Sequence, residues 1–203
     1  MNAMWQSDVD TEVYIFQRAK HLQQHCGDQI FIEESASGIL CALVDGLGSG
    51  KEAEKAAKAV TEAIDANSSL KSLADIVARS NEAVAGLRGA AIAVWRADWA
   101  KQKLTYCGIG NIRFYMLGED DKLVYPISST GFLSGRKQKI RTQEFSYRPG
   151  STFLMHSDGL TLAGVKKHLH ARGSIETIGH NIESNVADVP EDDVTFLVGR
   201  MKS

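Results

Sequence analysis

The sequence contains few cysteines and no long apolar run, and each of these features excludes a class of protein. Cys26, Cys41 and Cys107 lie far apart and form no Cys-x-x-Cys pair, so neither a disulfide framework nor a zinc knuckle is indicated. No run approaches the roughly 20 apolar residues of a membrane span. The first residues, Met-Asn-Ala-Met-Trp, lack the basic and apolar parts of a secretory signal. We therefore expect a cytoplasmic protein without a membrane partner.

An excess of charge of one sign is also missing. The chain has 23 Lys and Arg against 25 Asp and Glu, a net charge of −2. It therefore lacks the excess of positive charge that is typical of proteins that bind nucleic acid. The hydrophobic content of 43% is typical of a globular protein. We expect a single domain, residues 1–203, which is long enough to bury a real core. The sequence does not determine the oligomeric state, for which a monomer is our expectation.

The hydrophobic periodicity predicts an α+β fold. Short strands are expected at 13–17, 29–33 and 38–44, and helices follow at 51–66 and 72–87. The first helix has an apolar, alanine-rich face made of Ala53, Ala56, Ala57, Val60 and Ile64. The remaining elements are strands at 90–95, 103–107, 112–117, 123–127, 140–147, 151–156 and 194–201, and helices at 164–170 and 174–186, the last with Ser174 as N-cap. Consecutive helices followed by many strands favour antiparallel sheets with helices packed outside.

Four aspartate-containing turns are the most informative feature that the sequence does have. They are Cys26-Gly27-Asp28, Val44-Asp45-Gly46, Ser157-Asp158-Gly159 and Asp192-Asp193-Val194-Thr195. Three of them adjoin strongly apolar runs, and a carboxylate at the end of a buried strand is costly unless something compensates it. A cluster of divalent cations held by oxygen ligands would compensate all four.

Other interpretations of the glycine-rich segment after Asp45 fail on specific positions. A phosphate-binding loop would need Gly at position 45 and Ser or Thr at position 52, where the chain has Asp45 and Glu52. The spacing of Gly46, Gly48 and Gly50 misses the dinucleotide fingerprint by one residue. A tight turn that needs glycine for its conformation alone would explain Gly48 and Gly50, but not a carboxylate at the strand end.

Several further motifs have a structural interpretation. Gly108-Ile109-Gly110-Asn111 is typical of a tight turn between strands. Strand alternation points His156 away from the side of Asp158, which favours a core histidine, although the sequence leaves a role for His156 or Asp193 open. His168 and His170 lie in a basic helix and are expected to face solvent.

In their order along nearly the whole chain, these turns resemble the protein phosphatase 2C-like (PPM) family, SpoIIE branch. The resemblance implies a four-layer α-β-β-α sandwich, with two antiparallel sheets and helices on the outer faces. Asp45 resembles the family's bridging metal ligand, with the Gly46 carbonyl as a further ligand. Asp158 and Asp192 match the aspartates of the second metal site, and Asp28 matches the acidic residue ahead of the bridging aspartate. These residues are the expected catalytic centre, holding two Mn²⁺ or Mg²⁺ ions.

The activity implied by the resemblance is that of a metal-dependent protein serine/threonine phosphatase. The short length, without a sensor domain, is similar to feedback phosphatases of bacterial stress signalling, whose substrates are phosphorylated stressosome proteins of the RsbS and RsbR type. A non-catalytic phosphatase-fold binding module is the alternative. A third possibility is a metal-dependent hydrolase of a small phosphate ester.

The chain departs from the family at two places. Ser49 stands where the branch often has His. The arginine that cradles phosphate in eukaryotic members has no convincing match before Asp28, where Gln23, Gln24 and His25 lie. The resemblance therefore implies that phosphate binding rests more heavily on the metals, and that affinity for small phosphoesters is poor.

Overall fold

The structure, a computed structural model, describes residues 2–7, 11–118, 120–170 and 173–201. The chain forms two compact units whose parts alternate along the sequence. The first unit consists of Met1–Leu22, Arg113–Pro126 and Tyr147–Ser203, and the second of Gln23–Ile112 and Ile127–Ser146. The expectation of one domain over residues 1–203 stays a prediction.

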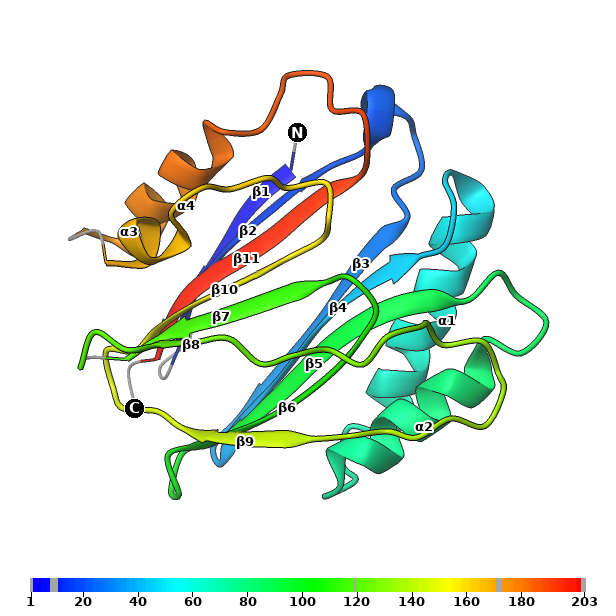
Figure 1. Ribbon diagram of the computed structural model, residues 1–203, viewed down its shortest axis with the longest axis horizontal. Helices are drawn as coiled ribbons and strands as arrows, with labels where there is room; N and C mark the ends of the chain where they lie inside the picture. Colours follow the sequence, from blue (N-terminus) through cyan, green and yellow to red (C-terminus); the bar gives the residue numbers. More distant parts are fainter. Residues whose placement is uncertain (1, 8–10, 119, 171–172, 202–203) are drawn as a thin grey trace. The chain divides into compact units, whose positions relative to one another are not determined.

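The second unit is an antiparallel sheet with two helices on one face (Figure 1). The strand order is β3 (Asp28–Ser35), β4 (Gly38–Gly46), β5 (Ala90–Asp98), β6 (Lys103–Ile109) and β9 (Gln143–Ser146). The helices are α1 (Lys51–Ala66) and α2 (Leu73–Ala83). The five residues predicted for the apolar face of α1 are all fully buried. The three alanines among them let the helix lie close to β3 and β4.

Helix α2 is shorter than the prediction of 72–87, which was wrong at the C-terminal end. Ser72 caps the helix, and its hydroxyl accepts a hydrogen bond from the Asp75 amide at 3.2 Å. The helix ends at Ala83, and Gly86 then takes a φ of 80°. That left-handed conformation, which glycine adopts without strain, turns the chain toward β5.

The first unit is also an antiparallel sheet with helices packed on it. Its strand order is β1 (Asn2–Ser7), β2 (Thr11–Arg18), β11 (Val194–Met201), β10 (Thr152–His156), β7 (Arg113–Leu117) and β8 (Leu123–Val124). A short 3₁₀ helix, η1 (Lys20–Leu22), follows β2, and α3 (Val165–Leu169) and α4 (Ile175–Glu183) precede β11. The core under α4 contains the stacked rings of Tyr14, Phe16 and Phe196. Ser174 caps α4 as predicted, since its hydroxyl accepts from the Thr177 amide at 3.2 Å.

Several predicted bounds need correction. The strand predicted at 140–147 forms only over Gln143–Ser146, and the helix predicted at 174–186 ends at Glu183. The periodicity gave no element at residues 2–7, where β1 pairs with β2 along its whole length. That strand is defined by hydrogen bonds to a partner rather than by a local pattern. Conversely, the strand predicted at 123–127 ends at Val124, and Pro126, which has no amide hydrogen to donate to a ladder, follows two residues later.

Two of the cysteines belong to the core, as predicted. Cys41 is 1% exposed and Cys107 is fully buried, and burial raises the pKa of the Cys107 thiol to about 12. Both are therefore protonated, unreactive thiols at neutral pH. Among the described helices, none combines the length and the apolar character needed to cross a membrane.

Candidate metal centre

In the second unit, the structure brings Asp28 and Asp45 together. Asp28 begins β3 and Asp45 lies next to the last residue of β4, and the antiparallel register pairs the two directly. Directly opposed residues lie on the same face of a sheet, with Cβ atoms roughly 5 Å apart. Asp28 is fully buried and Asp45 is partly buried. Two directly opposed carboxylates repel each other. A cation bound between them would remove that repulsion, so the pair fits a metal site better than a strand end without a ligand.

Gly46 occupies a position that only glycine can fill. A Cβ atom added there would lie 1.9 Å from the carbonyl oxygen of Ala53 in α1. The Gly46 amide donates to the Gly27 carbonyl at 3.0 Å, which links the end of β4 to the residue before Asp28. The close packing of α1 on this strand end therefore fixes the backbone around Asp45.

In the first unit, the structure brings Asp158 and Asp192 to the same end of the sheet. β10 and β11 are antiparallel neighbours, so the turn after His156 lies beside the turn before Val194. Two hydrogen bonds join these turns: the Ser157 amide donates to the Thr195 carbonyl at 2.9 Å, and the Thr195 amide donates to the Ser157 hydroxyl at 3.0 Å. Asp158 and Asp192 are both exposed at the end of this rigid pair.

The neighbouring Asp193 has a structural role. It is 6% exposed, and its Oδ1 accepts a hydrogen bond from the Lys20 amide at 2.8 Å. The Asp192 carboxylate, by contrast, is exposed and accepts from the Asp193 amide at 3.0 Å. This difference favours Asp192 over Asp193 as the residue that faces a ligand.

His156 is a buried core residue, as the strand alternation predicted. It is 3% exposed, its Nδ1 donates to the Ser157 carbonyl at 2.8 Å, and its ring stacks on Tyr115. Burial, together with the nearby charge of Arg113, lowers the pKa of His156 below its ordinary value. A neutral, enclosed imidazole of this kind holds the strand end in place.

The predicted ligands thus form two sets, Asp28 with Asp45 and Gly46 in one unit, and Asp158 with Asp192 in the other. Within the described part of the chain, no three or more His, Cys, Asp or Glu side chains form a group that could hold a metal ion. The complete ligand set therefore stays a prediction.

Sequence reasoning missed two side chains near Gly46. The Arg88 guanidinium covers Gly48, where an added Cβ would lie 2.4 Å from one of its nitrogens. His25 Nδ1 lies 2.6 Å from Glu54 Oε2 in the first turn of α1. Arg88 reaches this strand end from a segment outside every motif, whereas His25 directly precedes the Cys26-Gly27-Asp28 turn and only its contact with Glu54 was not foreseen.

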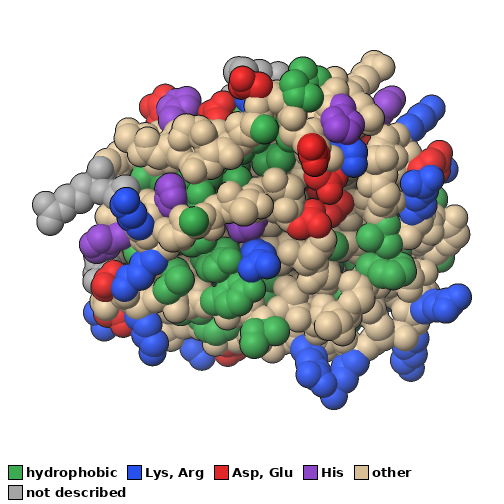
Figure 2. All heavy atoms as spheres, turned by 45° about the horizontal axis from the view of Figure 1, so that its top comes forward, with side chains coloured by type: hydrophobic (Ala, Val, Ile, Leu, Met, Phe, Trp, Pro, Cys, Tyr) green, Lys and Arg blue, Asp and Glu red, His purple; other side chains and the backbone are tan. Residues whose placement is uncertain are grey.

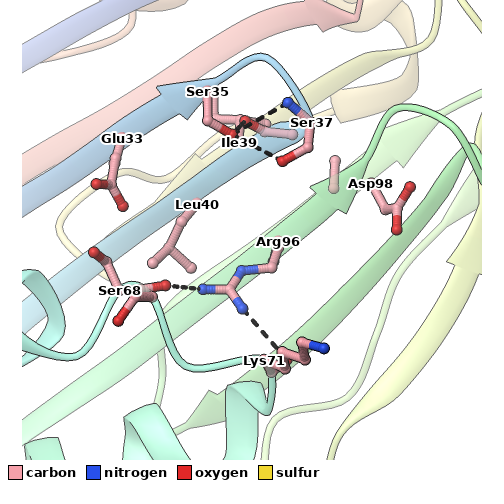
Figure 3. A pocket seen from close by; sticks show the side chains of 12 residues that line it. Glu33, Ser35, Ser37, Ile39, Leu40, Ser68, Lys71, Arg96 and Asp98 are labelled. Carbon is pink, nitrogen blue, oxygen red and sulfur yellow. Dashed lines mark hydrogen bonds between the residues drawn. The ribbon is translucent and has the colours of Figure 1, made fainter.

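A cavity of about 380 Å³ lies elsewhere in the second unit, at the opposite end of β4 and β5 from Asp45 (Figure 3). Arg96 points into the space between the sheet and the connection from α1 to α2. Its guanidinium donates to the carbonyls of Ser68, Leu70 and Lys71. Lys71, Glu33 and Asp98 also line the cavity, so its walls carry both signs of charge, and the guanidinium of Arg96 is already occupied by backbone carbonyls. This arrangement is a structural clamp rather than an anion site.

The family follows from comparison with known proteins. The family model described as Stage II sporulation protein E (SpoIIE) matches residues 35–202. The chain belongs to the SpoIIE family. Its similarity to the phosphoserine phosphatase RsbX of Bacillus subtilis (strain 168) is 30% identity over 190 residues, covering 94% of each protein.

Solved structures of the SpoIIE family and its relatives confirm the fold. RsbX crystallised in complex with magnesium matches with a TM-score of 0.93 and 28% identity, over 99% of this chain and 100% of that chain. A solved structure from work on the bacterial stressosome matches with a TM-score of 0.83 and 26% identity. The match covers 94% of this chain and 99% of that chain. The protein phosphatase 2C domain of SpoIIE from Bacillus subtilis, at 14% identity and a TM-score of 0.77 over 94% and 63%, shares the fold alone.

These similarities confirm the predicted α+β fold, with two antiparallel sheets and packed helices, and the predicted class of enzyme, a phosphatase. The similarity to a stress-signalling phosphatase of the SpoIIE branch is confirmed as well.

Proposed function

We propose that this SpoIIE-family chain is a metal-dependent serine/threonine protein phosphatase whose substrates are phosphorylated stressosome proteins of the RsbS and RsbR type. The observation that carries the metal dependence is the buried Asp28 directly opposite Asp45. The similarity to RsbX over 94% of both proteins supports the substrate class. We further propose that the enzyme acts in the cytoplasm, where it would reset the stress signal as feedback.

The predicted site residues would act as metal ligands. Asp28, Asp45 and the Gly46 carbonyl would be metal ligands from the second unit, and Asp158 and Asp192 metal ligands from the first. When bound, Mn²⁺ or Mg²⁺ ions would supply Lewis-acid chemistry that activates water and neutralises phosphate charge. The aspartates accept no proton in this scheme; they fix geometry and offset the charge of the cations. The rigid turns around Gly46 and Ser157 keep their carboxylates in position before substrate arrives.

The direct test is phosphate release from a phosphoserine-bearing stressosome protein with Mn²⁺ or Mg²⁺, followed by excess chelator. We expect release that the chelator abolishes. Asp45→Asn and Asp158→Asn should each lower kcat by more than about a hundredfold, because each removes a charged ligand from the metals. Asp188→Asn, an exposed aspartate near Asp192, is the matched control and should retain full activity.

The outcomes separate this proposal from its rivals. No release with any divalent metal from a folded protein would favour the non-catalytic binding module. Faster hydrolysis of free phosphoserine than of the phosphoprotein would favour a small-ester hydrolase. Retained activity in both aspartate variants would refute the two-metal assignment.

A further inference from the structure

The connection between β8 and β9 is long and irregular, yet its part in the second unit, residues 127–142, is firmly held. The Ser129 amide donates to the Gly108 carbonyl at 2.8 Å, and its carbonyl accepts from the Gly110 amide at 2.9 Å. Leu133, fully buried, exchanges two backbone hydrogen bonds with Ala90, at 2.8 and 3.1 Å. Irregular segments of this length inside a compact domain are usually functional.

The buried side chain of Asn81 also holds this loop in place. Asn81 of α2 is 6% exposed. Its amide nitrogen donates to the Arg136 carbonyl at 2.9 Å, and its oxygen accepts from the amides of Ser134 and Gly135 at 3.0 and 3.3 Å. A buried asparagine that satisfies both of its polar atoms on one loop pre-organises that loop. The 127–142 loop is therefore a rigid support for whatever its exposed side chains bind.

The loop lies beside the end of β4. Gly46 pairs with Ala90 in the ladder between β4 and β5, and Ala90 pairs with Leu133. Since neighbouring strands lie about 5 Å apart, Leu133 is about 10 Å from Gly46. The turn after Asp45, the start of β5 and the 127–142 loop thus form three adjacent segments at one end of the sheet.

Two exposed side chains stand on these segments. The Arg88 guanidinium covers Gly48, and Arg88 is exposed. Phe132 is 43% exposed, and its ring borders Gly89, where an added Cβ would lie 2.8 Å from the ring. A cation close to Gly48 and an exposed aromatic ring against Gly89 therefore lie at the end of this sheet where β4 ends. Aromatic side chains contribute large apolar areas to interfaces, so the exposed Phe132 ring offers a contact to a partner.

The loop also concentrates positive charge. Its end carries four exposed cations, Arg136, Lys137, Lys139 and Arg141. The chain as a whole has a net charge of −2, so this local excess is a feature of the loop and not of the composition. Charge complementarity therefore indicates an acidic partner.

We propose that Arg88, Phe132 and the cations of the 127–142 loop form a recognition surface for an acidic, phosphorylated protein segment. Arg88 binds the phosphate of the phosphoserine, and Phe132 packs against the residue beside it. This inference rests on the proposed function and specifies how that site selects its substrate.

The test measures binding without turnover. A fluorescent acidic phosphoserine peptide is titrated with the full chain carrying Asp158→Asn, and the dissociation constant is read from anisotropy. Arg88→Ala should weaken binding at least about tenfold, because a charge-assisted contact to phosphate is lost, whereas Arg88→Lys should recover part of it. Phe132→Ala should weaken binding about fivefold. Affinity should also fall as salt rises.

Arg79→Ala is the matched control, because Arg79 is an exposed arginine of α2 whose partner is Glu82. It should leave the dissociation constant unchanged. Thermal unfolding of each variant shows that the fold is intact. Dissociation constants of Arg88→Ala and Phe132→Ala within twofold of the parent would overturn the proposal, as would equal binding of the unphosphorylated peptide.

Turnover by the chain with Asp158 intact separates this proposal from the proposed function. Phosphate release that falls in Arg88→Ala through a higher KM supports both. Release that is unchanged in Arg88→Ala and Phe132→Ala overturns the surface and leaves the phosphatase. Peptide binding that depends on Arg88, with no release under any metal, supports the surface and removes the catalytic proposal.

Discussion

At the scale of single residues, the candidate centre depends on how closely the backbone can pack around the aspartates. Gly46 lies against the Ala53 carbonyl, and Gly159 lies against the Asp193 carbonyl, where an added Cβ would be 2.2 Å away. Each of these glycines directly follows a predicted metal ligand, Asp45 or Asp158. Their lack of a side chain lets a helix or a neighbouring turn touch the strand end and fix the carboxylate beside it.

Gly46→Ala should therefore destabilise the protein strongly. The added methyl group meets backbone atoms of α1, which no rotamer change can move, and we expect a loss of about 3 kcal/mol in the free energy of unfolding. The measurement is urea unfolding followed by circular dichroism. Gly86→Ala is the control, because an added Cβ there meets nothing within 4 Å. In that variant the free energy of unfolding should fall by only about 1 kcal/mol, because alanine must adopt the left-handed backbone conformation of Gly86. Equal losses in the two variants would contradict the packing argument.

At the scale of elements, α1 is held at both ends by contacts that its own sequence does not reveal. Its N-terminal end packs on Gly46, and the connection that follows it is clamped by Arg96 of β5 (Figure 3). Half-burial lowers the pKa of Arg96, yet the guanidinium stays charged at neutral pH and donates to three backbone carbonyls. These carbonyls lie just beyond the helix, where they have no partner within it.

Arg96→Ala should loosen the connection between α1 and α2. Hydrogen bonds from a charged donor are lost and carbonyls lose their partner, so we expect the free energy of unfolding to fall by about 2 kcal/mol. Hydrogen exchange at residues 67–72 should accelerate at the same time. Lys101→Ala removes an exposed ion pair with Asp98 and should change stability by less than about 0.5 kcal/mol. An unchanged exchange rate in Arg96→Ala would show that the clamp has no role.

At the scale of the whole molecule, charge and fold constrain function in different ways. Figure 2 shows side chains of both signs on the face in view, and the net charge of the chain is −2. Such a surface offers no broad field for nucleic acid, and any electrostatic selection must come from a local cluster such as the 127–142 loop. Asp28 and Asp45 are directly opposed carboxylates, so a cation that relieves their repulsion would also stabilise the fold.

Divalent metal should therefore stabilise the whole protein. A ligand that binds only the folded state at 100 times its dissociation constant adds about 2.7 kcal/mol. For a chain of this length, that corresponds to a rise in Tm of about 5–10 °C. The measurement is thermal unfolding with Mn²⁺ or Mg²⁺ and with chelator. Asp45→Asn should abolish the rise and Asp188→Asn should keep it. A rise of the same size in Asp45→Asn would place the metal elsewhere.

Much of the molecule was accessible from its sequence, because the signals are local. The spacing of Ala53, Ala56, Ala57, Val60 and Ile64 predicted α1 with both of its ends correct, and Ser174 identified the start of α4. The ordered aspartate turns pointed to the SpoIIE branch, which the family match confirms. The helix period, the cap and each separate aspartate turn are local patterns in which neighbouring residues act on one another directly.

Only the tertiary structure decided which distant residues meet. The register of β3 against β4 places Asp28 opposite Asp45. The hydrogen bond from the Lys20 amide gives Asp193 a structural role. The position of Arg88 over Gly48 follows from the start of β5 and has no counterpart in any motif. Such contacts depend on strand register and side-chain packing across the chain, which periodicity within one segment does not encode.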